Sequence, residues 1–552
     1  MPADNLTRVE AQERAAQVQT ESYEIALDLT TGAETFRADT TIRFRATEGT
    51  STFLDAITTA VHSIELNGES IATSAADGTR IQLDGLAAEN VVRVVADMNY
   101  TNTGEGLHRF VDPVDGEVYL YSQFEVPDSR RVFPVFEQPD LKATFQFIVT
   151  APATWRVVSN SPSPEPVVEG ETATWTFEPT PRISSYITAL IAGPYESVHD
   201  ELQSASGRTI PLGVYARKSL MQYLDAHYVF DITKKGFAYF EEKFGYPYPF
   251  AKYDQLFVPE FNAGAMENAG AVTFTETYIF RSKVTDAIRE RRVVTILHEL
   301  AHMWFGDLVT MRWWNGIWLN EAFATFMEVK AVEAWRPDWD MWSGFCADRA
   351  AAFDVDALAS TRPIEYPVVT PADAESMFDV LTYEKGAAVV RMLEQFLGEE
   401  TFRDGVRRYL SDHLGGNTDN ADLWAALEAA SGEPVGDLME NWIFHGGHPL
   451  VEVTADDGRC TLSQRPFRYD GRDDGTRWQV PVRLRTTVGE HRVLLGDRPV
   501  IVELDGPLLT GNADATGFHR TSLPAAPRPA LLTAAERAMA VDDRWAATLA
   551  GH

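Results

Sequence analysis

The spacing of apolar residues changes three times along the chain. A period of two begins at Tyr23 and recurs, with Asn-Gly and Asp-Gly pairs between the runs, to about residue 195. From about residue 219, apolar residues recur at helical spacing as far as Phe444. The period of two returns after His448 and lasts to about residue 523, before a last helical segment. Strict alternation indicates half-buried strands, and the longer spacing indicates amphipathic helices.

This pattern predicts a multidomain α+β protein. We expect an N-terminal β domain, a sandwich or saddle-like sheet, over residues 1–195 and a mixed α/β domain over 196–447. A small β-sandwich domain follows over 448–523, and residues 524–552 form a Pro-rich linker and a helix. A length of 552 residues is enough for three or four domains.

The run His298-Glu299-Leu300-Ala301-His302 carries the most specific chemistry of the sequence. Histidines four residues apart lie on one face of an α-helix, so both imidazoles can reach one Zn²⁺. Glu299 points partly around the helix, where it can act on a water bound to the metal rather than bind the metal itself. The third ligand should be a carboxylate from a nearby element, and Glu321 in the next helical run supplies one.

A site of two histidines and one glutamate leaves the fourth position of the ion for water, as catalytic zinc sites do. We therefore expect one Zn²⁺ per chain, with Glu299 as the general base. The alternative is a core helix whose histidines bond to backbone carbonyl groups, since the flanking residues are apolar on nearly every side. A strand segment, then this helix, then a long helical lobe is the order expected of a thermolysin-like metallopeptidase domain.

The chain is strongly acidic, with 81 acidic against 48 basic residues and a formal charge of −33. This balance argues against a nucleic-acid partner, whose phosphates would be repelled. No apolar run reaches the ~18 residues of a membrane span, and the first residues lack the basic and apolar regions of a signal peptide. We expect a cytoplasmic monomer with no membrane partner, in which Cys346 and Cys460 are free thiols.

Several motifs in the same order resemble the M1 family of zinc aminopeptidases, the aminopeptidase N group. The run Gly264-Ala265-Met266-Glu267-Asn268 precedes the histidine motif, and 18 residues separate His302 from Glu321. The likeness extends over nearly the whole chain. The other runs that fit are Ser122-Gln123-Phe124-Glu125, Phe133–Pro139, Tyr383-Glu384-Lys385-Gly386-Ala387 and Asn512–Arg520.

The resemblance implies an exopeptidase that acts on peptides with a free N-terminus. An α-amino group is charged near neutral pH, and Glu125 and Glu267 are the carboxylates that would pair with it. These contacts would also set which peptide bond is cut. Gly264 and Ala265 would let the substrate main chain approach closely, and Asn268 belongs to the same substrate-binding motif.

The resemblance also assigns a pocket and an oxyanion donor. Gln123 and Met266 would line the first side-chain pocket, where a flexible thioether tolerates varied shapes. We therefore expect broad specificity, mainly for neutral and basic first residues. Tyr383 would donate its phenol to the developing oxyanion, a contact typically worth on the order of 3 kcal/mol of barrier.

Three other functions fit the same scaffold: an endopeptidase, an epoxide hydrolase, and an inactive zinc-containing protein that binds peptides. The presence of both Glu299 and Tyr383 counts against the inactive form. His445 and His448 flank two glycines like a metal pair, but they lie at a domain junction. We expect them to be structural.

The family usually continues with a large helical domain, and the segment after Leu531 looks like its first helix. Thr533 and Glu536 stand at capping-box spacing. The apolar residues of this helix include Trp545 and Leu549, and they need a partner. We expect the helix to dock weakly on the small β domain or to be partly disordered. With most of the helical domain absent, we also expect an open cleft and slower turnover.

Overall fold

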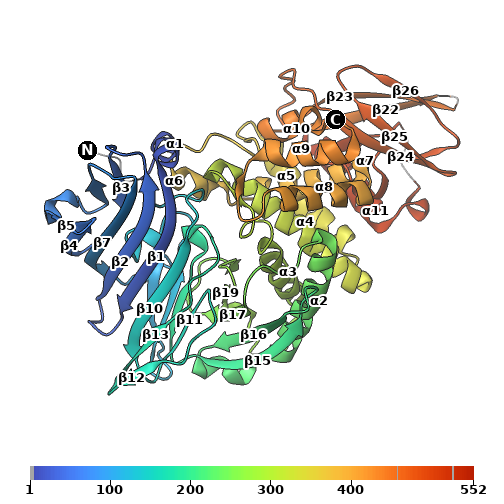
Figure 1. The fold of residues 1–552 in the computed structure, drawn as a ribbon. Helices are drawn as coiled ribbons and strands as arrows, with labels where there is room; N and C mark the ends of the chain where they lie inside the picture. Colours follow the sequence, from blue (N-terminus) through green and yellow to red (C-terminus); the bar gives the residue numbers. More distant parts are fainter. Residues whose placement is uncertain (1–4, 457, 525–527, 552) are drawn as a thin grey trace. The chain divides into compact units, whose positions relative to one another are not determined.

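The structure is a computed structural model that describes residues 5–456, 458–524 and 528–551 (Figure 1). The chain divides into two compact units. The first unit comprises Met1–Trp314, Val368–Glu375 and His413–Thr418, and the second comprises Asn315–Pro367, Ser376–Asp412 and Asp419–His552. The four segments predicted above, with boundaries near residues 195, 447 and 523, stay a prediction.

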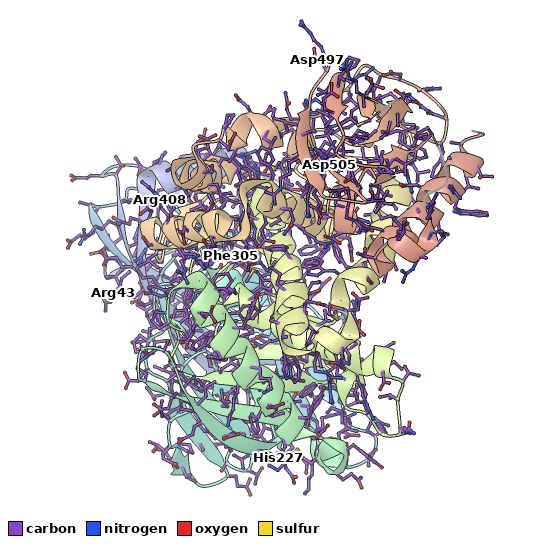
Figure 2. All side chains as sticks on the ribbon, turned by 90° about the vertical axis from the view of Figure 1, so that its right-hand side faces the viewer. Arg43, His227, Phe305, Arg408, Asp497 and Asp505 are labelled. Carbon is purple, nitrogen blue, oxygen red and sulfur yellow. The ribbon has the colours of Figure 1, made fainter. Side chains whose placement is uncertain are left out.

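The first unit begins with the β-rich region that the alternation predicts. Its largest sheet has eight strands in the order β12 (Val167–Glu169), β13 (Thr172–Thr176), β10 (Thr144–Pro152), β1 (Val18–Asp28), β2 (Thr35–Ala46), β7 (Glu89–Asn99), β4 (Ala60–Leu66) and β5 (Glu69–Ile71). On β2, the buried Ile42 and Phe44 flank the exposed Arg43, whose side chain extends away from the ribbon (Figure 2). Period-two alternation thus separates a core face from a solvent face.

Two further sheets of the first unit share a hydrophobic core. The four-stranded sheet has the order β11 (Arg156–Ser159), β14 (Leu190–Gly193), β9 (Val118–Gln123) and β8 (Gly106–Val111). The five-stranded sheet has the order β15 (Glu196–Gln203), β16 (Thr209–Ala216), β17 (Tyr253–Val258), β19 (Ala271–Thr275) and β18 (Ala265–Met266). Their core joins Tyr121 and Ile191 to Leu256 and Val258. The short pairs are β3 (Thr52–Asp55) with β6 (Arg80–Leu83) and β20 (Thr310–Met311) with β21 (Asn417–Thr418).

The helices of the first unit are α1 (Arg8–Gln17), α2 (Ala226–Phe244), α3 (Asp286–His302) and the short α6 (Pro371–Ala374). α2 packs on β15, β16 and α3. At Gly236 on α2 the helices come close, since a Cβ atom there would lie 2.5 Å from Leu297 Cδ2 of α3. The helical region predicted from about residue 219 begins with a 3₁₀ helix at Lys218–Tyr223, and the α-helix α2 follows from Ala226.

The second unit is built around α4 (Ile317–Trp335), which is buried over nearly its whole length. A helix that is apolar on every side has to be covered on every side. α4 packs against α5 (Met341–Asp356), α7 (Gly386–Leu397) and the π-helical turn η9 (Leu381–Lys385) that precedes α7. The remaining helices before the small β domain are α8 (Glu399–Asp412), α9 (Asn420–Ser431) and α10 (Val435–Phe444).

The small β domain of the second unit consists of two sheets, where the returning alternation predicts strands. One has the order β26 (Val500–Glu503), β23 (Arg459–Phe467), β22 (His448–Asp456) and β28 (Arg520–Ser522). The other has the order β25 (Glu490–Leu495), β24 (Val480–Thr486) and β27 (Leu508–Thr510). His448 starts β22 fully buried, with its ring against Phe353 and Phe467, which supports its structural role.

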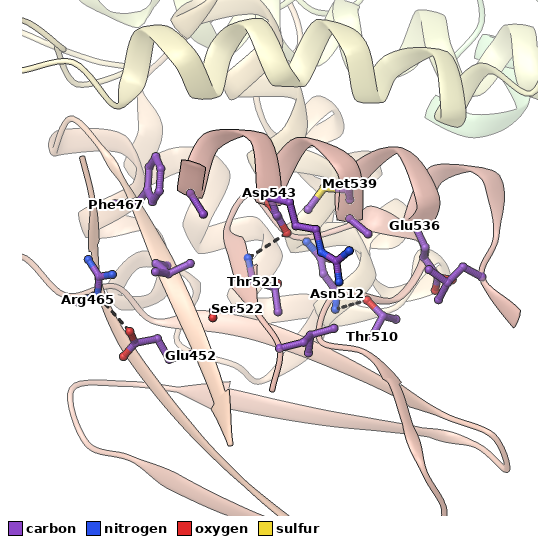
Figure 3. A pocket seen from close by; sticks show the side chains of 16 residues that line it. Glu452, Arg465, Phe467, Thr510, Asn512, Thr521, Ser522, Glu536, Met539 and Asp543 are labelled. Carbon is purple, nitrogen blue, oxygen red and sulfur yellow. Dashed lines mark hydrogen bonds and ion pairs between the residues drawn. The ribbon is translucent and has the colours of Figure 1, made fainter. Parts of the chain in front are cut away.

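The last helix, α11 (Ala534–Leu549), has the capping box that Thr533 and Glu536 predict. Of the two expectations for this helix, docking on the small β domain holds and partial disorder does not, because α11 packs on β28 and also on α5. Its Asp543 accepts a hydrogen bond from the Thr521 backbone of β28, beside a cavity of about 310 Å³ (Figure 3). Its Met539 packs with Cys346 of α5. Trp545 and Leu549, two of the apolar residues that need a partner, are 62% and 54% exposed.

Two sequence-based expectations concern the chain as a whole. Cys346 and Cys460 are buried free thiols, as predicted. Among the described residues, no helix is both long enough and apolar enough to cross a membrane.

Candidate active site

Helix α3 presents His298 and His302 together, as their spacing predicts. Their Nε2 atoms lie 3.0 Å apart. The Nδ1 atom of His302 lies 2.9 Å from the carbonyl oxygen of Phe305, a residue labelled in Figure 2, so Nδ1 carries the proton and Nε2 keeps its lone pair. The alternative was that both histidines bond to backbone carbonyl groups in the core. This is true of Nδ1 of His302, but it does not account for the two Nε2 atoms that lie side by side. Two imidazole nitrogens in this arrangement can bind one metal ion.

The predicted substrate residues of β9 and β18 also lie together in the first unit. Glu125 follows β9 and Glu267 follows β18, and a carboxylate oxygen of one lies within 4.8 Å of a carboxylate oxygen of the other. Glu267 is buried, and Glu125 is half-buried. Two carboxylates this close repel one another unless a cation or a proton joins them. At the ends of the same strands, Gln123 Nε2 lies 3.7 Å from Met266 Sδ.

The glycine-containing motif forms the last strand in its sheet order. Ala265 in β18 pairs with β19, and the Thr275 backbone N–H donates to the Gly264 carbonyl oxygen at 3.0 Å. Asn268 is fully buried, and its side-chain amide donates to Thr273 Oγ1 at 3.3 Å. An edge strand of this kind can pair with an added extended peptide through main-chain hydrogen bonds.

The second unit holds the other two predicted residues on neighbouring elements. Glu321 is buried in the second turn of α4, and Tyr383 is half-buried in η9, which packs against α4. The helical spacing around Tyr383 takes the form of a π-helical turn that leads into α7. The Lys385 N–H bonds to the Val380 carbonyl oxygen, five residues back, at 3.0 Å. Such π-helical turns are rare and are frequent at functional sites.

The segment that follows Glu125 is supported by a buried network that sequence reasoning missed. Glu137, in the run Phe133–Pro139, accepts a hydrogen bond from the Arg130 backbone N–H at 2.7 Å. Its own N–H donates to Asp55, which also pairs with the buried Arg14. Burial raises the pKa of Glu137 to about 8. The motif was noted only as a family likeness, and its long-range partners leave no local signal.

Asp307, five residues beyond His302, is a second residue that sequence reasoning missed. Its side chain is buried, and burial followed by the negative charge of Glu267 raises its pKa well above the usual range. The nearby Lys142 donates to the Asp307 carbonyl oxygen at 3.2 Å, and burial lowers the pKa of Lys142 to about 7. An aspartate directly after the apolar Trp304-Phe305-Gly306 was the available signal.

Comparison with known proteins matches both the β-rich N-terminal region and the mixed region that follows it to family models. Residues 19–187 match the family model described as the peptidase M1 N-terminal domain, and residues 228–442 match the peptidase family M1 domain. The chain belongs to peptidase family M1.

Three curated relatives illustrate the likeness. The chain is 53% identical to aminopeptidase N of Streptomyces lividans, over 92% of the chain and 61% of that protein. It is 37% identical to tricorn protease-interacting factor F2 of Thermoplasma volcanium, over 73% of the chain and 50% of that protein. It is 35% identical to aminopeptidase M1 of Arabidopsis thaliana, over 78% of the chain and 51% of that protein. The chain thus spans between half and about three fifths of these relatives.

Proposed function

We propose that this chain is a zinc-dependent aminopeptidase that hydrolyses the N-terminal peptide bond of peptides. The observation that carries the proposal lies within the first unit. Two histidine Nε2 atoms 3.0 Å apart support a metal site, and the close carboxylates of Glu125 and Glu267 support recognition of an ammonium group. An endopeptidase does not need to bind a substrate ammonium group, so the second pair favours an exopeptidase.

The donors fit zinc. Imidazole and carboxylate are the ligands that Zn²⁺ takes in catalytic sites, and family M1 consists of zinc metallopeptidases. His298, His302 and Glu321 would hold one ion per chain, with His302 oriented through its bond to the Phe305 carbonyl. When bound, zinc would lower the pKa of a water molecule and polarise the substrate carbonyl group.

The chain's own residues would do the remaining chemistry. Glu299 takes a proton from the attacking water and delivers it to the leaving amine, as a general base and then a general acid. Tyr383 donates its hydroxyl to the oxygen that gains charge as the carbonyl is attacked. Glu125 and Glu267 hold the substrate ammonium group, so that the first peptide bond is the one presented.

The substrate main chain would lie along β18, where Gly264, Ala265 and Asn268 form the edge motif. Gln123 and Met266 would line the first side-chain pocket. This lining fits broad specificity for neutral and basic first residues, because an arginine or lysine stem is apolar over most of its length. We further propose that the protein acts as a cytoplasmic monomer.

A panel of aminoacyl chromogenic amides, each paired with its N-acetylated form, tests the proposal. We expect cleavage of free alanyl, leucyl, methionyl and arginyl amides and much slower cleavage of the acetylated forms. Equal cleavage of blocked and free substrates would favour an endopeptidase. No cleavage of any amide by a zinc-loaded protein would favour the inactive peptide-binding form.

Metal analysis tests the ligand set separately from activity. The purified protein should contain one zinc per chain, and His298→Ala and Glu321→Ala should both lose it. A third variant, His445→Ala, changes an exposed histidine and should keep the metal. Stoichiometric zinc in both ligand variants would show that the ligands are assigned wrongly.

A further inference from the structure

The second unit contains a buried ion pair directly beside the turn that carries Tyr383. Lys385, two residues beyond Tyr383, and Asp356, the last residue of α5, are both fully buried. Lys385 Nζ lies 2.9 Å from Asp356 Oδ2 and 3.1 Å from Oδ1. It also donates to the Gly447 carbonyl oxygen at 3.2 Å. The three ammonium protons therefore have three acceptors.

The aspartate is equally well bonded. Asp356 Oδ1 accepts from the Gly447 backbone N–H at 2.8 Å and from the Thr361 hydroxyl at 2.7 Å, and Oδ2 lies 3.4 Å from His448 Nδ1. Gly447 thus contacts both members of the pair, and its positive φ of 96° favours glycine at this position. The pair joins η9 to the end of α5 and to the chain that enters the small β domain.

The other end of the turn is held by a second set of polar contacts. Asp379 Oδ1 accepts from the Leu381 backbone N–H at 2.8 Å and from the Arg362 guanidinium at 2.5 Å. On the helix side, Gly386 lies so close to α4 that a Cβ atom would be 2.6 Å from Ala322 Cβ. Ala322 directly follows Glu321. The turn is thus held on three sides within the second unit, while Tyr383 itself stays half-buried.

A buried ion pair is weak evidence for stability, because an apolar pair of similar size often stabilises as well or better. What the charged pair adds is a fixed orientation of the segments that it joins, because its hydrogen bonds require narrow ranges of distance and angle. A fixed orientation matters most in a π-helical turn, because such turns are rare and occur mostly as single turns inside α-helices, so the local backbone alone does not favour them.

We propose that Asp356 and Lys385 are positioning residues for the reaction. They fix the π-helical turn so that the Tyr383 hydroxyl is held ready for the developing oxyanion. This inference rests on the role given to Tyr383 in the proposed function. It assigns a task to the lysine of the Tyr-Glu-Lys-Gly-Ala motif, which touches neither metal ligand nor substrate in that proposal.

Steady-state kinetics on leucyl p-nitroanilide tests the proposal with four variants and with the combination of Lys385→Met and Tyr383→Phe. Lys385→Met and the double variant Asp356→Asn/Lys385→Met remove the directional contact, and the double variant leaves no buried unpaired charge. Tyr383→Phe removes the hydroxyl itself. Lys330→Met is the matched control, because Lys330 pairs with Glu394 between α4 and α7 without touching η9. Zinc content and the thermal midpoint are measured for each.

We expect Lys385→Met and the double variant to lower kcat at least ~10-fold with KM within about twofold, since misplacing a transition-state contact by about 1 Å can cost on the order of 100-fold. Lys330→Met should keep kcat within about twofold. Combined with Tyr383→Phe, Lys385→Met should cause no further loss, because both changes remove one interaction. Where the single lysine variant does not fold, the double variant decides.

Two results would overturn the positioning role alone: a wild-type kcat in folded Lys385→Met and double variants, or a full additional loss when Lys385→Met is added to Tyr383→Phe. A wild-type kcat in Tyr383→Phe would overturn the proposed role of Tyr383, and the positioning role with it. In that case cleavage of free but not acetylated amides would still support the aminopeptidase.

Discussion

Helix α3 and the turn η9 present their functional side chains in opposite ways. In α3, regular helical geometry alone brings the Nε2 atoms of His298 and His302 to 3.0 Å. In η9, the backbone is π-helical instead of α-helical, and residues distant in the sequence, such as Asp356, stabilise this geometry. Local geometry therefore places the two proposed histidine ligands, whereas long-range contacts place the proposed oxyanion donor. Variants at the two places should fail differently.

The largest expected effect is the loss of the general base on α3. Glu299→Gln keeps the shape of the helix and both histidines but removes proton transfer, so kcat should fall by about 10²–10⁴-fold. Metal analysis should still find one zinc per chain, because regular helical spacing is unchanged. Near-normal turnover would contradict the role of Glu299, and loss of zinc would contradict the claim that local geometry suffices for the histidine ligands.

The next largest effect concerns the carboxylates of Glu125 and Glu267, which lie close together just after β9 and β18. Glu267→Gln should lower kcat/KM for free aminoacyl amides by roughly 10–150-fold, because a hydrogen bond to a charged group is worth about 1.5–3 kcal/mol. The preference for free over acetylated substrates should narrow by the same factor. Glu260→Gln, in the exposed turn after β17, is the matched control and should leave both quantities unchanged. An unchanged preference in Glu267→Gln would show that the amino group is bound elsewhere.

Two glycines allow the packing of η9 against α4 to be compared with the packing of α2 against α3. Gly386→Ala should lower stability by ~1–3 kcal/mol, because its Cβ would meet Ala322 Cβ of α4 at 2.6 Å and neither atom can rotate away. Gly236→Ala on α2 should cost less, since its Cβ meets the ends of the Leu297 and Leu300 side chains and Ala gains up to ~1 kcal/mol in a helix. Thermal midpoints of the two variants test the order, and a larger fall for Gly236→Ala would reverse the argument.

The smallest expected effect concerns Glu10, which caps the first helix and forms an ion pair. Glu10 closes the capping box of α1 with Thr7 and pairs with Arg80 at 2.8 Å. The hydrogen bond from Arg80 lowers the pKa of Glu10 to about 2 from its ordinary 4.5. The unfolded chain binds this proton first as pH falls, so the stabilisation is complete above pH 4.5 and is lost between 4.5 and about 2.

Glu10→Gln should therefore lower stability at neutral pH by about 1 kcal/mol and flatten the loss of stability on acidification. Chemical denaturation at pH 7 and near pH 3 measures both. The parallel change Glu13→Gln, on the same helix, controls for the loss of one carboxylate. Equal pH dependence in Glu10→Gln and the wild type would contradict the lowered pKa.

Local rules in the sequence determined much of this protein. Alternation predicted the strands around Ile42 and Phe44, a capping box predicted the start of α11, and the spacing of His298 and His302 predicted their convergence. Strand pleat, helix pitch and cap hydrogen bonds all act over a few residues. The motifs also predicted that Glu125 and Glu267 would lie together, through family likeness rather than spacing.

Only the tertiary structure decided the π-helical turn at Tyr383, the docking of α11 on α5 and the exposure of Trp545. Lys385 and Asp356 are 29 residues apart, and Asp356 and His448 are 92 apart. The preference for one backbone geometry over another at such places is set by contacts that form only when distant segments meet. An extra residue in a helical turn leaves no local signal in the sequence, so the buried pair that selects it is visible only in the folded chain.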